Sequence, residues 1–172
     1  MVRCVLLAFL IVMQSAVAKD LQIPDTNLWF TAPEGFTELT REEIDVKFRS
    51  NAAPRYVIGN ERRTTTVAYD VRSVAVTDEI LEAQLDQIGE SFGRVIPGFV
   101  SIRRTMQVLN GRKWAYFEMK SNAVDADIHN IVLMSAYEGR MVVLNFNSTK
   151  ADFERMESIL RTSIASLGSR EE

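Results

Sequence analysis

Two residue types on which many enzymes and secreted domains depend are almost missing from this sequence. Cys4 is its only cysteine and His129 its only histidine. One cysteine cannot close an intramolecular disulfide, and a thiolate zinc centre needs several cysteine or histidine ligands. The composition therefore excludes a disulfide-stapled fold and a thiolate zinc centre. A stable domain of this sequence has to depend on its apolar core.

The sequence also lacks an apolar run long enough for a transmembrane helix, which takes about 20 residues. Its longest apolar run, Val5–Met13, follows a short basic start and precedes the small residues of Gln14–Ala18. This layout is typical of a Sec signal peptide that is cleaved after the last of these residues. We therefore predict a periplasmic or secreted protein that begins at Lys19, has lost Cys4, and does not insert stably into a membrane.

The charge of the remaining chain is nearly balanced. Without a signal peptide at 1–18 and its single charge at Arg3, the chain has 154 residues, of which 19 are basic and 23 acidic, a net charge of −4. Such a balance argues against a nucleic-acid-binding protein. The length suits one domain. We place it at 28–167, between a flexible lead-in at 19–27 and a tail at 168–172.

The first half of the domain is expected to combine short strands with one capped helix. Runs of β-branched and aromatic residues predict three strands, at 28–31, 56–58 and 64–76. Thr40 and Glu43 have the spacing of a capping box, in which each side chain accepts a hydrogen bond from the other residue's amide. A short helix that continues to about Phe48 is therefore expected.

The middle of the domain reads as a helix followed by a hairpin. Four apolar residues at helical spacing predict an amphipathic helix over 78–92 that ends at Gly93. The Asn110-Gly111 pair favours a tight type I′ turn, because both residues tolerate positive φ. This turn would join strands at 99–108 and 114–120, and a polar loop would follow at 121–127.

The last third predicts the centre of the sheet and part of its cover. Strands are expected at 128–137 and 141–146. Within them, 131–134 and 141–144 are apolar without alternation, and strands with two apolar faces must be covered on both. A helix over 149–167 presents an apolar stripe that includes Leu160 and Ile164. The sequence therefore predicts an α+β fold. It is an α/β/α sandwich whose central, mostly antiparallel sheet of about six strands is covered by helices on both faces.

In their order and in their sequence motifs, these elements resemble the PsbP/Mog-like superfamily and its bacterial DcrB-type members. The opening Trp29–Phe36 is close to that family's f-x-x-P-x-G-[WF], and Tyr137–Phe146 with Ile159–Ile164 is close to its closing strand and helix. The likeness spans residues 28–167. It implies an α/β/α sandwich that serves as a binding module, with no catalytic residues to transfer. Members of the superfamily include photosystem accessory subunits, a Ran-binding nuclear-import factor and adaptors for type VI secretion effectors.

A basic segment is the best candidate for a partner-binding surface. No acidic residue occurs between Ser91 and Phe117, whereas five basic residues do. With the Arg62-Arg63 turn they could form two positive hairpin tips that attract an acidic protein or lipid head groups. Alternatively, the tips are solvated, and their charges prevent the sheet edges of different molecules from associating. This is the more frequent role of such charges. The candidate residues are Arg62, Arg63, Arg103, Arg104, Arg112 and Lys113.

Trp114 and Tyr116 complete the candidate set. They alternate with Ala115 and Phe117, so the two pairs face opposite sides of the predicted strand. Exposed beside Arg112, the tryptophan and the tyrosine would anchor a partner. Covered by a helix, they would belong to the core, and the sequence favours this second interpretation.

His129 is the other residue that invites a chemical role, because Asp125 and Asp127 precede it closely. A zinc site needs three or four ligands, and the spacing of these three groups gives poor support for one. Ser121 and Ser135 do not lie in the G-x-S-x-G elbow of a hydrolase. The sequence therefore predicts no catalytic residue, no metal and no cofactor.

We accordingly expect a non-enzymatic binding protein that acts through protein contacts in the periplasm, such as an immunity protein or an accessory factor. Its partner would be another protein, acidic if the basic tips are used, and not a nucleic acid. A carrier for a small hydrophobic or anionic ligand is the alternative, since seven methionines and nine phenylalanines could line a pocket. A hydrolase that uses His129 is the least favoured function. The sequence does not indicate the oligomeric state.

Overall fold

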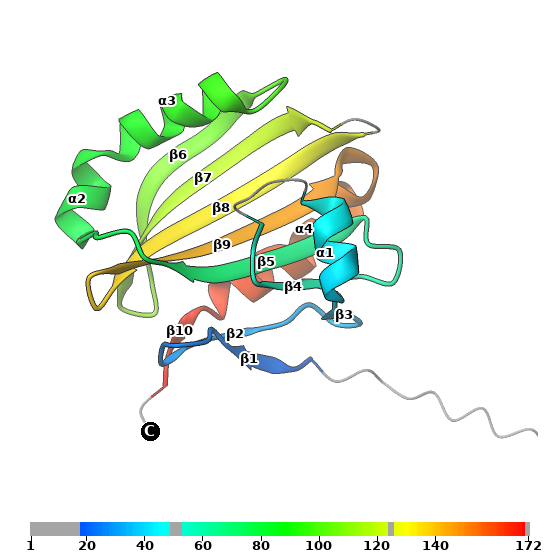
Figure 1. Cartoon of the computed structure of the whole chain (residues 1–172), viewed down its shortest axis with the longest axis horizontal. Helices are drawn as coiled ribbons and strands as arrows, with labels where there is room; N and C mark the ends of the chain where they lie inside the picture. Colours follow the sequence, from blue (N-terminus) through cyan, green and yellow to red (C-terminus); the bar gives the residue numbers. More distant parts are fainter. Residues whose placement is uncertain (1–17, 49–52, 124–125, 171–172) are drawn as a thin grey trace, which may run out of the picture.

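The structure, a computed structural model, describes residues 18–48, 53–123 and 126–170 of the 172-residue chain. Within these residues, seven strands form one sheet in which every neighbouring pair is antiparallel. The order across the sheet is β3-β4-β5-β9-β8-β7-β6 (Figure 1). The strands are β3 (Thr37–Glu38), β4 (Tyr56–Gly59), β5 (Thr65–Arg72), β6 (Val100–Leu109), β7 (Arg112–Asn122), β8 (Asp127–Tyr137) and β9 (Arg140–Thr149).

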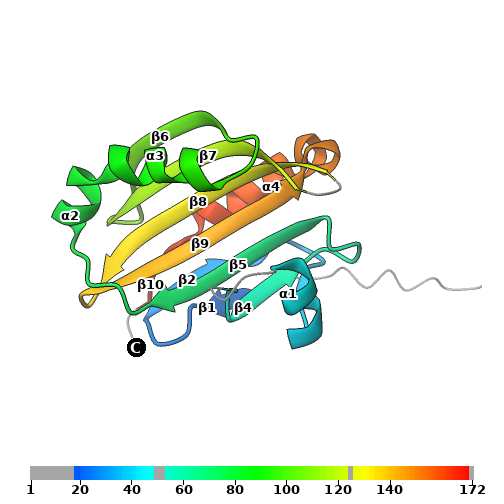
Figure 2. The ribbon, with the colours of Figure 1, turned by 45° about the horizontal axis from the view of Figure 1, so that its top comes forward.

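Helices cover one face of this sheet in two separate places (Figures 1 and 2). α2 (Asp78–Ala83) and α3 (Leu85–Val95) lie over β6, β7 and β8, where Leu81 and Phe117 are buried together. α1 (Arg41–Lys47) lies over β4 and β5, where Ile44 is buried. On this face, helices therefore cover the strands toward the two edges of the sheet, and the strand between them, β9, is less covered.

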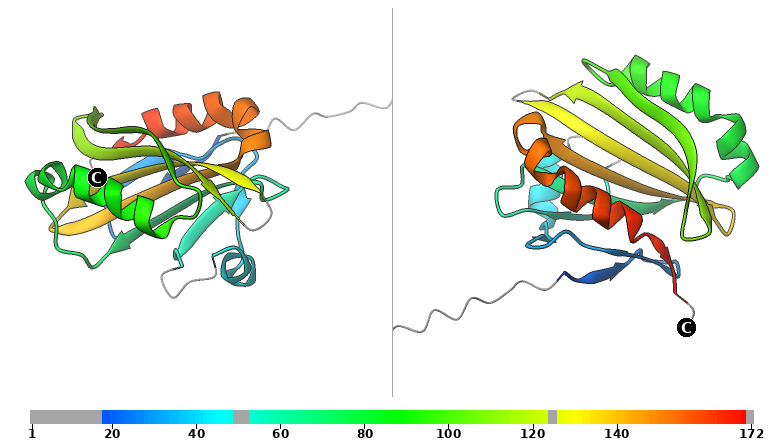
Figure 3. Two further views of the ribbon diagram at one scale, coloured as in Figure 1. Left: turned by 90° about the horizontal axis from the view of Figure 1, so that it is seen from above. Right: turned by 180° about the vertical axis from the view of Figure 1, so that it is seen from behind.

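The opposite face is covered by α4 (Lys150–Ala165) and by a second sheet (Figure 3). Three short antiparallel strands in the described part of the chain form this sheet in the order β1-β2-β10, and they are β1 (Asp20–Gln22), β2 (Leu28–Thr31) and β10 (Gly168–Ser169). Phe30 and Leu160 share one core with Trp114 and Phe146. The predicted α/β/α sandwich is confirmed, and the small sheet adds to its cover. No helix in the described ranges is long and apolar enough to cross a bilayer.

The two strands predicted to be central lie in the middle of the sheet. In β8 the run Ile131–Ser135 is buried on both faces, because Ile131 and Leu133 face α4 while Val132 and Met134 face α2 and α3. In β9 the α4 face is buried, but Val143 and Asn145 on the other face are only half-buried. They lie below the gap between the two groups of helices.

The helix expected over 78–92 is broken into α2 and α3 at Gln84, whose backbone leaves the helical region (φ −100°, ψ 5°). The break lets α2 pack against β7 and β8 while α3 packs against β6. Gly93 does not end the helix, which continues to Val95. A methyl group at Gly93 would come within 3.3 Å of the Phe99 ring, so this glycine permits a close approach.

Both ends of the domain are more ordered than composition suggests. The expected flexible lead-in contains β1, and Ile23 is fully buried. The expected tail contains β10, which pairs with β2. These strands are only three and two residues long, and their pairing is with distant parts of the chain, so no local pattern marks them. The leader itself lies outside the described residues.

Local signals at turns and caps are confirmed. Asn110 and Gly111 have φ of +47° and +82°, and the Glu138-Gly139 turn has the same form. In the capping box, the Glu43 amide donates to the Thr40 hydroxyl at 3.3 Å and the Thr40 amide to the Glu43 carboxylate at 2.8 Å. Strand ends were less well predicted: β5 stops at Arg72 rather than residue 76, and residues 121 and 122 belong to β7.

Candidate functional site

The two basic turns lie at opposite ends of the main sheet (Figures 1 and 3). In the turn between β4 and β5, the Arg62 guanidinium lies 3.8 Å from Asp152 in the first turn of α4. In the turn between β6 and β7, the Asn110 amide donates to the Leu167 carbonyl just beyond α4 at 2.7 Å. Because α4 has 16 residues, its ends are about 24 Å apart. The turns therefore do not form one positive surface.

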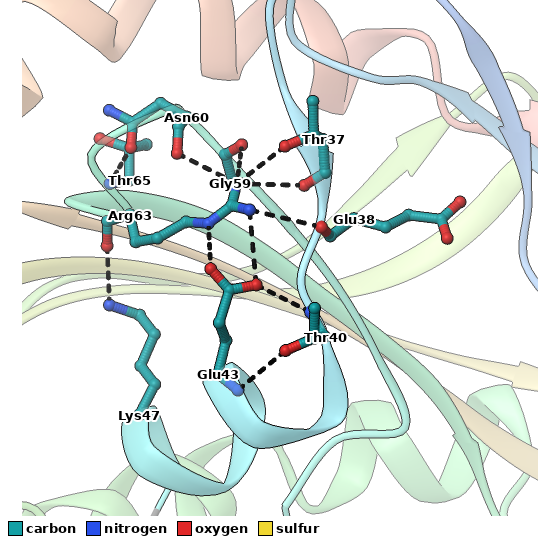
Figure 4. A network of polar contacts seen from close by, with 9 residues as sticks. All are labelled: Thr37, Glu38, Thr40, Glu43, Lys47, Gly59, Asn60, Arg63 and Thr65. Carbon is teal, nitrogen blue, oxygen red and sulfur yellow. Dashed lines mark hydrogen bonds and ion pairs between the residues drawn. The ribbon is translucent and has the colours of Figure 1, made fainter.

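Arg63 holds its own turn and α1 together (Figure 4). Its guanidinium donates to the Glu43 carboxylate at 2.9 Å, to the Thr37 hydroxyl at 2.9 Å and to the Gly59 carbonyl at 3.0 Å. Its own carbonyl accepts from Lys47 at 2.9 Å, and its φ is +56°. The network joins β3, β4 and α1, so Arg63 is occupied within the fold.

Arg62 is the more available member of this turn, because most of its side chain is exposed. Its partner Asp152 also accepts hydrogen bonds from Thr64 and Arg155. The Thr64 hydrogen bond is the main cause that lowers the pKa of Asp152, and the charges of Arg155 and Arg62 add to it. Arg62 is largely exposed and lies 3.8 Å from Asp152, so its ion pair is weak.

The basic residues after the β6–β7 turn also have partners. Arg112 donates to the Ala136 carbonyl at 2.7 Å and lies over the Tyr137 ring, 5.4 Å from its centroid. Lys113 pairs with Glu82 of α2 at 3.1 Å, and this hydrogen bond raises the pKa of the lysine. Both cations tie the hairpin to neighbouring elements.

Trp114 and Tyr116 belong to the core on the α4 side. Trp114 is 0% exposed and Tyr116 is 3% exposed. Both pack in the cluster that contains Leu160 and Phe146. This placement agrees with the favoured interpretation, and it leaves neither side chain on the surface for a partner.

Arg103 and Arg104 lie on opposite faces of β6. Arg104 pairs with Asp86 of α3 at 3.0 Å, and it runs so close over Gly89 that a methyl group there would meet it at 2.5 Å. Arg103 is on the α4 side, with its guanidinium 5.4 Å from the centroid of the Tyr116 ring, and it is exposed. Of the two, only Arg103 is available to a partner.

β6 gives the predicted basic segment an open strand edge. It is ten residues long, and no described strand pairs with its outer side. Three aliphatic side chains on it are exposed, namely Val100 (56%), Ile102 (47%) and Val108 (64%). Edge strands with exposed apolar side chains are sites where another extended chain can pair.

The backbone pattern of β6 follows from its hairpin. In a two-residue hairpin the flanking residues, here Leu109 and Arg112, form a hydrogen-bonded pair, and such pairs alternate along the ladder. The amides and carbonyls of Arg104, Met106 and Val108 therefore point away from β7. One of these carbonyls, that of Met106, accepts from the Thr105 hydroxyl at 3.0 Å.

The start of the edge is less regular. Ile102 is an extra residue between the Ser101–Met119 and Arg103–Glu118 pairs, which makes a β-bulge. Bulges twist an edge strand and limit pairing along it. The stretch open to a partner strand therefore runs from Arg103 to Leu109.

His129 lies in a buried polar cluster with Tyr116, Glu118 and Arg161. Glu118 accepts from Tyr116 at 2.7 Å, from His129 at 2.8 Å and from Arg161 at 2.9 Å. The Phe153 ring stacks on His129 with 3.4 Å between centroids. The sequence signal for this cluster was Glu118, an acidic residue between the apolar residues 114–117 and Met119. A buried carboxylate needs hydrogen-bond partners.

Burial and these hydrogen bonds shift the pKa values of Glu118, His129 and Tyr116. Burial alone would raise the pKa of Glu118, but hydrogen bonds from Tyr116, Arg161 and His129 outweigh it and lower the pKa. Burial lowers the pKa of His129 despite the adjacent carboxylate. Burial, with the hydrogen bond to Glu118, raises the pKa of Tyr116 to about 12. The cluster is an ionised Glu118 held by a neutral histidine, a phenol and a guanidinium, and it joins α4 to β7 and β8.

This arrangement does not resemble a metal centre. Within the described ranges, His129 is not grouped with two further His, Cys, Asp or Glu residues in a position to share an ion. Asp127 is exposed and lies 3.9 Å from Lys150. Asp125 lies outside the described residues.

A large groove lies between α1, the β4–β5 turn and the segment before β8. Its volume is about 960 Å³. Leu39, Val46 and Ile128 line it, with Arg62 and Lys47 among the charged residues around them. Val46 on α1 is 69% exposed and borders this groove.

Solved structures share this architecture. Cyanobacterial PsbP (CyanoP) from Synechocystis matches over 92% of this chain and 96% of its own, with a TM-score of 0.67 and 12% identity. The chain has a PsbP-like fold. LpqN of Mycobacterium tuberculosis, a protein involved in cell envelope biogenesis, matches over 84% of this chain and 83% of its own (TM-score 0.56, 11% identity). A Pseudomonas aeruginosa protein of unknown function, a putative regulator, matches over 90% and 99% (TM-score 0.53, 11% identity).

No family model and no curated protein matches the sequence. At 11–12% identity, the likeness to PsbP and LpqN concerns the fold alone. It supports the resemblance to the PsbP superfamily, whereas the narrower DcrB-type assignment stays a prediction. Function has to be argued from the surfaces of this chain.

Proposed function

We propose that this chain is an exported, non-enzymatic binding protein that holds a protein partner along the free edge of β6. The observation that carries the proposal is the edge from Arg103 to Leu109, with its outward-facing backbone groups and exposed aliphatic neighbours. An extended segment of a partner would add a strand there, so that backbone hydrogen bonds supply affinity and side chains supply selectivity. The envelope role of LpqN, which shares the PsbP-like fold, and the predicted signal peptide are consistent with action outside the cytosol.

The chemistry of the edge favours an acidic partner segment. No acidic residue lies between Ser91 and Phe117, and Arg103 is exposed beside the edge. Arg104 is neutralised by Asp86, which leaves Arg103 as the main charge that a bound strand would meet. A carboxylate placed opposite Arg103 would set the register of the added strand.

Two roles fit such a protein, an accessory factor of an envelope complex and an immunity protein that blocks a toxin in the periplasm. They differ in the partner that the edge should capture. A gene for a secreted toxin next to the gene for this chain would favour immunity.

Site-specific photo-cross-linking in intact cells tests the edge. A cross-linking amino acid at Val100, in β6 just before the open stretch, should capture a partner that extends past the bulge. The same residue at Val46, an exposed valine on α1, should not (56% and 69% exposed, respectively). Val108→Pro should abolish the Val100 adduct, because the Val108 amide points away from β7 and proline removes only the hydrogen bond to a partner. Arg103→Glu should weaken the adduct.

A partner captured equally by the wild type, Val108→Pro and Arg103→Glu would contradict the edge as the binding surface. Retained thermal stability of both variants serves as the control, since the side chains of Val108 and Arg103 are exposed.

The large groove supports a second candidate function, that of a carrier for a small hydrophobic ligand. An exposed Val46 facing a groove of about 960 Å³ is the specific observation. Native mass spectrometry of the purified protein should then show a bound small mass that Val46→Lys removes and Val108→Pro retains. A ligand-free chain would weaken this candidate without affecting the edge.

Export has a separate test. N-terminal sequencing of the protein recovered from the periplasm should return Lys19, because cleavage is predicted after Ala18. An N-terminus at Met1 on protein recovered from the cytosol would contradict export.

A further inference from the structure

A polar cavity lies at the end of the main sheet where β5 ends. The last residues of β5, the residue before β4, the start of β9 and the turn between β1 and β2 line it. The cavity has a volume of about 350 Å³ and is lined by Arg55, Arg72 and Arg140 together with Asp25 and Asp70. We refer to it as the arginine cavity.

Asp70 forms the buried wall of the arginine cavity. Its side chain is 4% exposed and accepts from the Nε of Arg55 at 2.7 Å and from the Val71 amide at 2.9 Å. The Arg72 guanidinium lies 3.5 Å from its second oxygen. One buried carboxylate thus orients two guanidinium groups toward the cavity.

Arg140 brings a third guanidinium from β9. Its Nη2 donates to the Asp25 carbonyl at 3.1 Å and lies 3.7 Å from Glu138, whose side chain is largely exposed. Unlike Arg55, Arg140 therefore has no buried carboxylate as its partner. An exposed pair at this distance contributes little, so its positive charge is poorly compensated.

The hydrogen-bond donors of these arginines are only partly used. Arg55 uses Nε and Nη2, the latter toward the Val71 carbonyl at 3.3 Å. Arg140 uses Nη2. A guanidinium has five N–H groups, so donors on both residues are left for a ligand in the cavity.

We propose that the arginine cavity binds a tetrahedral oxyanion, either free phosphate or a phosphomonoester group. Three guanidinium groups against two aspartates give the lining a formal charge of +1. Guanidinium groups recognise phosphate through paired N–H donors, and donors that arrive from three separate segments of the chain suit a tetrahedral anion better than a planar carboxylate. Ser73 adds a hydroxyl to the same lining.

Asp25 is the competitor of such an anion. Its carboxylate lies 3.7 Å from Arg55, its side chain is 59% exposed, and its backbone has a φ of +62° in the β1–β2 turn. A phosphate at Arg55 and Arg140 would be repelled by this carboxylate, which can turn toward solvent. Removal of its charge should therefore strengthen binding, and loss of Arg140 should weaken it.

Isothermal titration with inorganic phosphate at low ionic strength tests the site on the full mature chain. Arg140→Gln should weaken binding by about tenfold or more, which corresponds to one charged hydrogen bond. Asp25→Asn should tighten binding severalfold, a gain that impaired folding cannot produce. Arg41→Gln, an exposed arginine paired with Asp45 on α1, should bind as the wild type does.

Vesicles distinguish the two sources of the phosphate group. Binding to vesicles with phosphatidic acid but not to phosphatidylcholine vesicles, lost in Arg140→Gln, would assign a lipid phosphomonoester, whereas phosphate binding without vesicle binding would assign the free anion. Absence of both, or phosphate binding that Arg140→Gln and Asp25→Asn leave unchanged, would overturn the proposal. The edge variant Val108→Pro should bind phosphate normally, so this inference and the proposed function fail separately.

Discussion

The two edges of the main sheet differ in length, in cover and in the use of arginine. The β3 edge is two residues long, and Arg63 ties it to α1 and β4 with hydrogen bonds to Thr37 and Glu43. The β6 edge is ten residues long and is unpaired among the described strands, and Arg103 beside it is exposed. Short, covered edges resist association, and long open ones invite it.

The contrast teaches that a basic residue in a turn or at an edge has no fixed role. Arg63 and Arg103 are both cationic and both lie near a sheet edge. Arg63 has carboxylate, hydroxyl and carbonyl partners from three elements, whereas Arg103 has the face of Tyr116. The number of internal partners decides whether the charge stabilises the fold or is left for another molecule.

The largest effect is expected in the core that both edges share. Leu160 is fully buried in α4, so Leu160→Ala should lower the free energy of unfolding by about 2–5 kcal/mol through a cavity. Urea denaturation measures it. An unchanged midpoint would mean that α4 does not hold the sheet, and the comparison of its edges would lose its basis.

The next largest effect is expected at the β3 edge. Arg63→Ala should lower the free energy of unfolding by about 2–3 kcal/mol, because hydrogen bonds to charged groups are lost. The neighbouring Arg62→Ala should change it by less than about 1 kcal/mol, since the Arg62 side chain is exposed and its guanidinium lies 3.8 Å from Asp152. Equal losses for the two variants would contradict the distinction between structural and available arginines.

Acid should affect the β6 half of the molecule before the β3 half. Burial lowers the folded pKa of His129 below 6.5, so its contribution to stability is complete above that pH and declines as the pH falls below it. Glu118, whose folded pKa is lowered from 4.5, loses its contribution as the pH falls further. The protection factors for hydrogen exchange should therefore fall in β7 and β8 first, and His129→Gln should remove the earlier part of this change.

The smallest stability effect is expected at Arg103. Arg103→Glu should change the free energy of unfolding by about 0.5 kcal/mol or less, because the side chain is exposed. The same change should reduce capture of a partner at Val100. A large loss of stability would show that Arg103 is structural after all, and would remove the contrast with Arg63.

Features that depend on neighbouring residues could be predicted from the sequence. The capping box at Thr40, the Asn110-Gly111 turn and the apolar run of β8 are local patterns with one favourable structure each. The resemblance to the PsbP superfamily was likewise carried by short motifs at the two ends of the domain. The arrangement of helices on both faces followed from apolar strands that need cover.

The candidate site could be predicted only in part. All six basic candidates lie in a turn, beside a turn or on an edge strand, as expected of hairpin residues, but most of their partners come from elements far away in the chain. Asp86 neutralises Arg104, and Glu82 neutralises Lys113. Neither pair has a spacing that a sequence pattern could reveal. The buried carboxylates Glu118 and Asp70, within apolar strands, were the signals for polar clusters that remained unused.

By itself, then, the sequence determined where most of the longer helices and strands lie, where the main turns occur and that the sheet is covered on both faces, because these depend on periodicity and backbone preferences over a few residues. Tertiary structure alone decided that β6 is an open edge, that Arg63 is internal while Arg103 is exposed, and that Arg55, Arg72 and Arg140 line one cavity. Strand order and long-range pairing set these contacts, and the free energy of a charge depends on what surrounds it in space rather than in the chain.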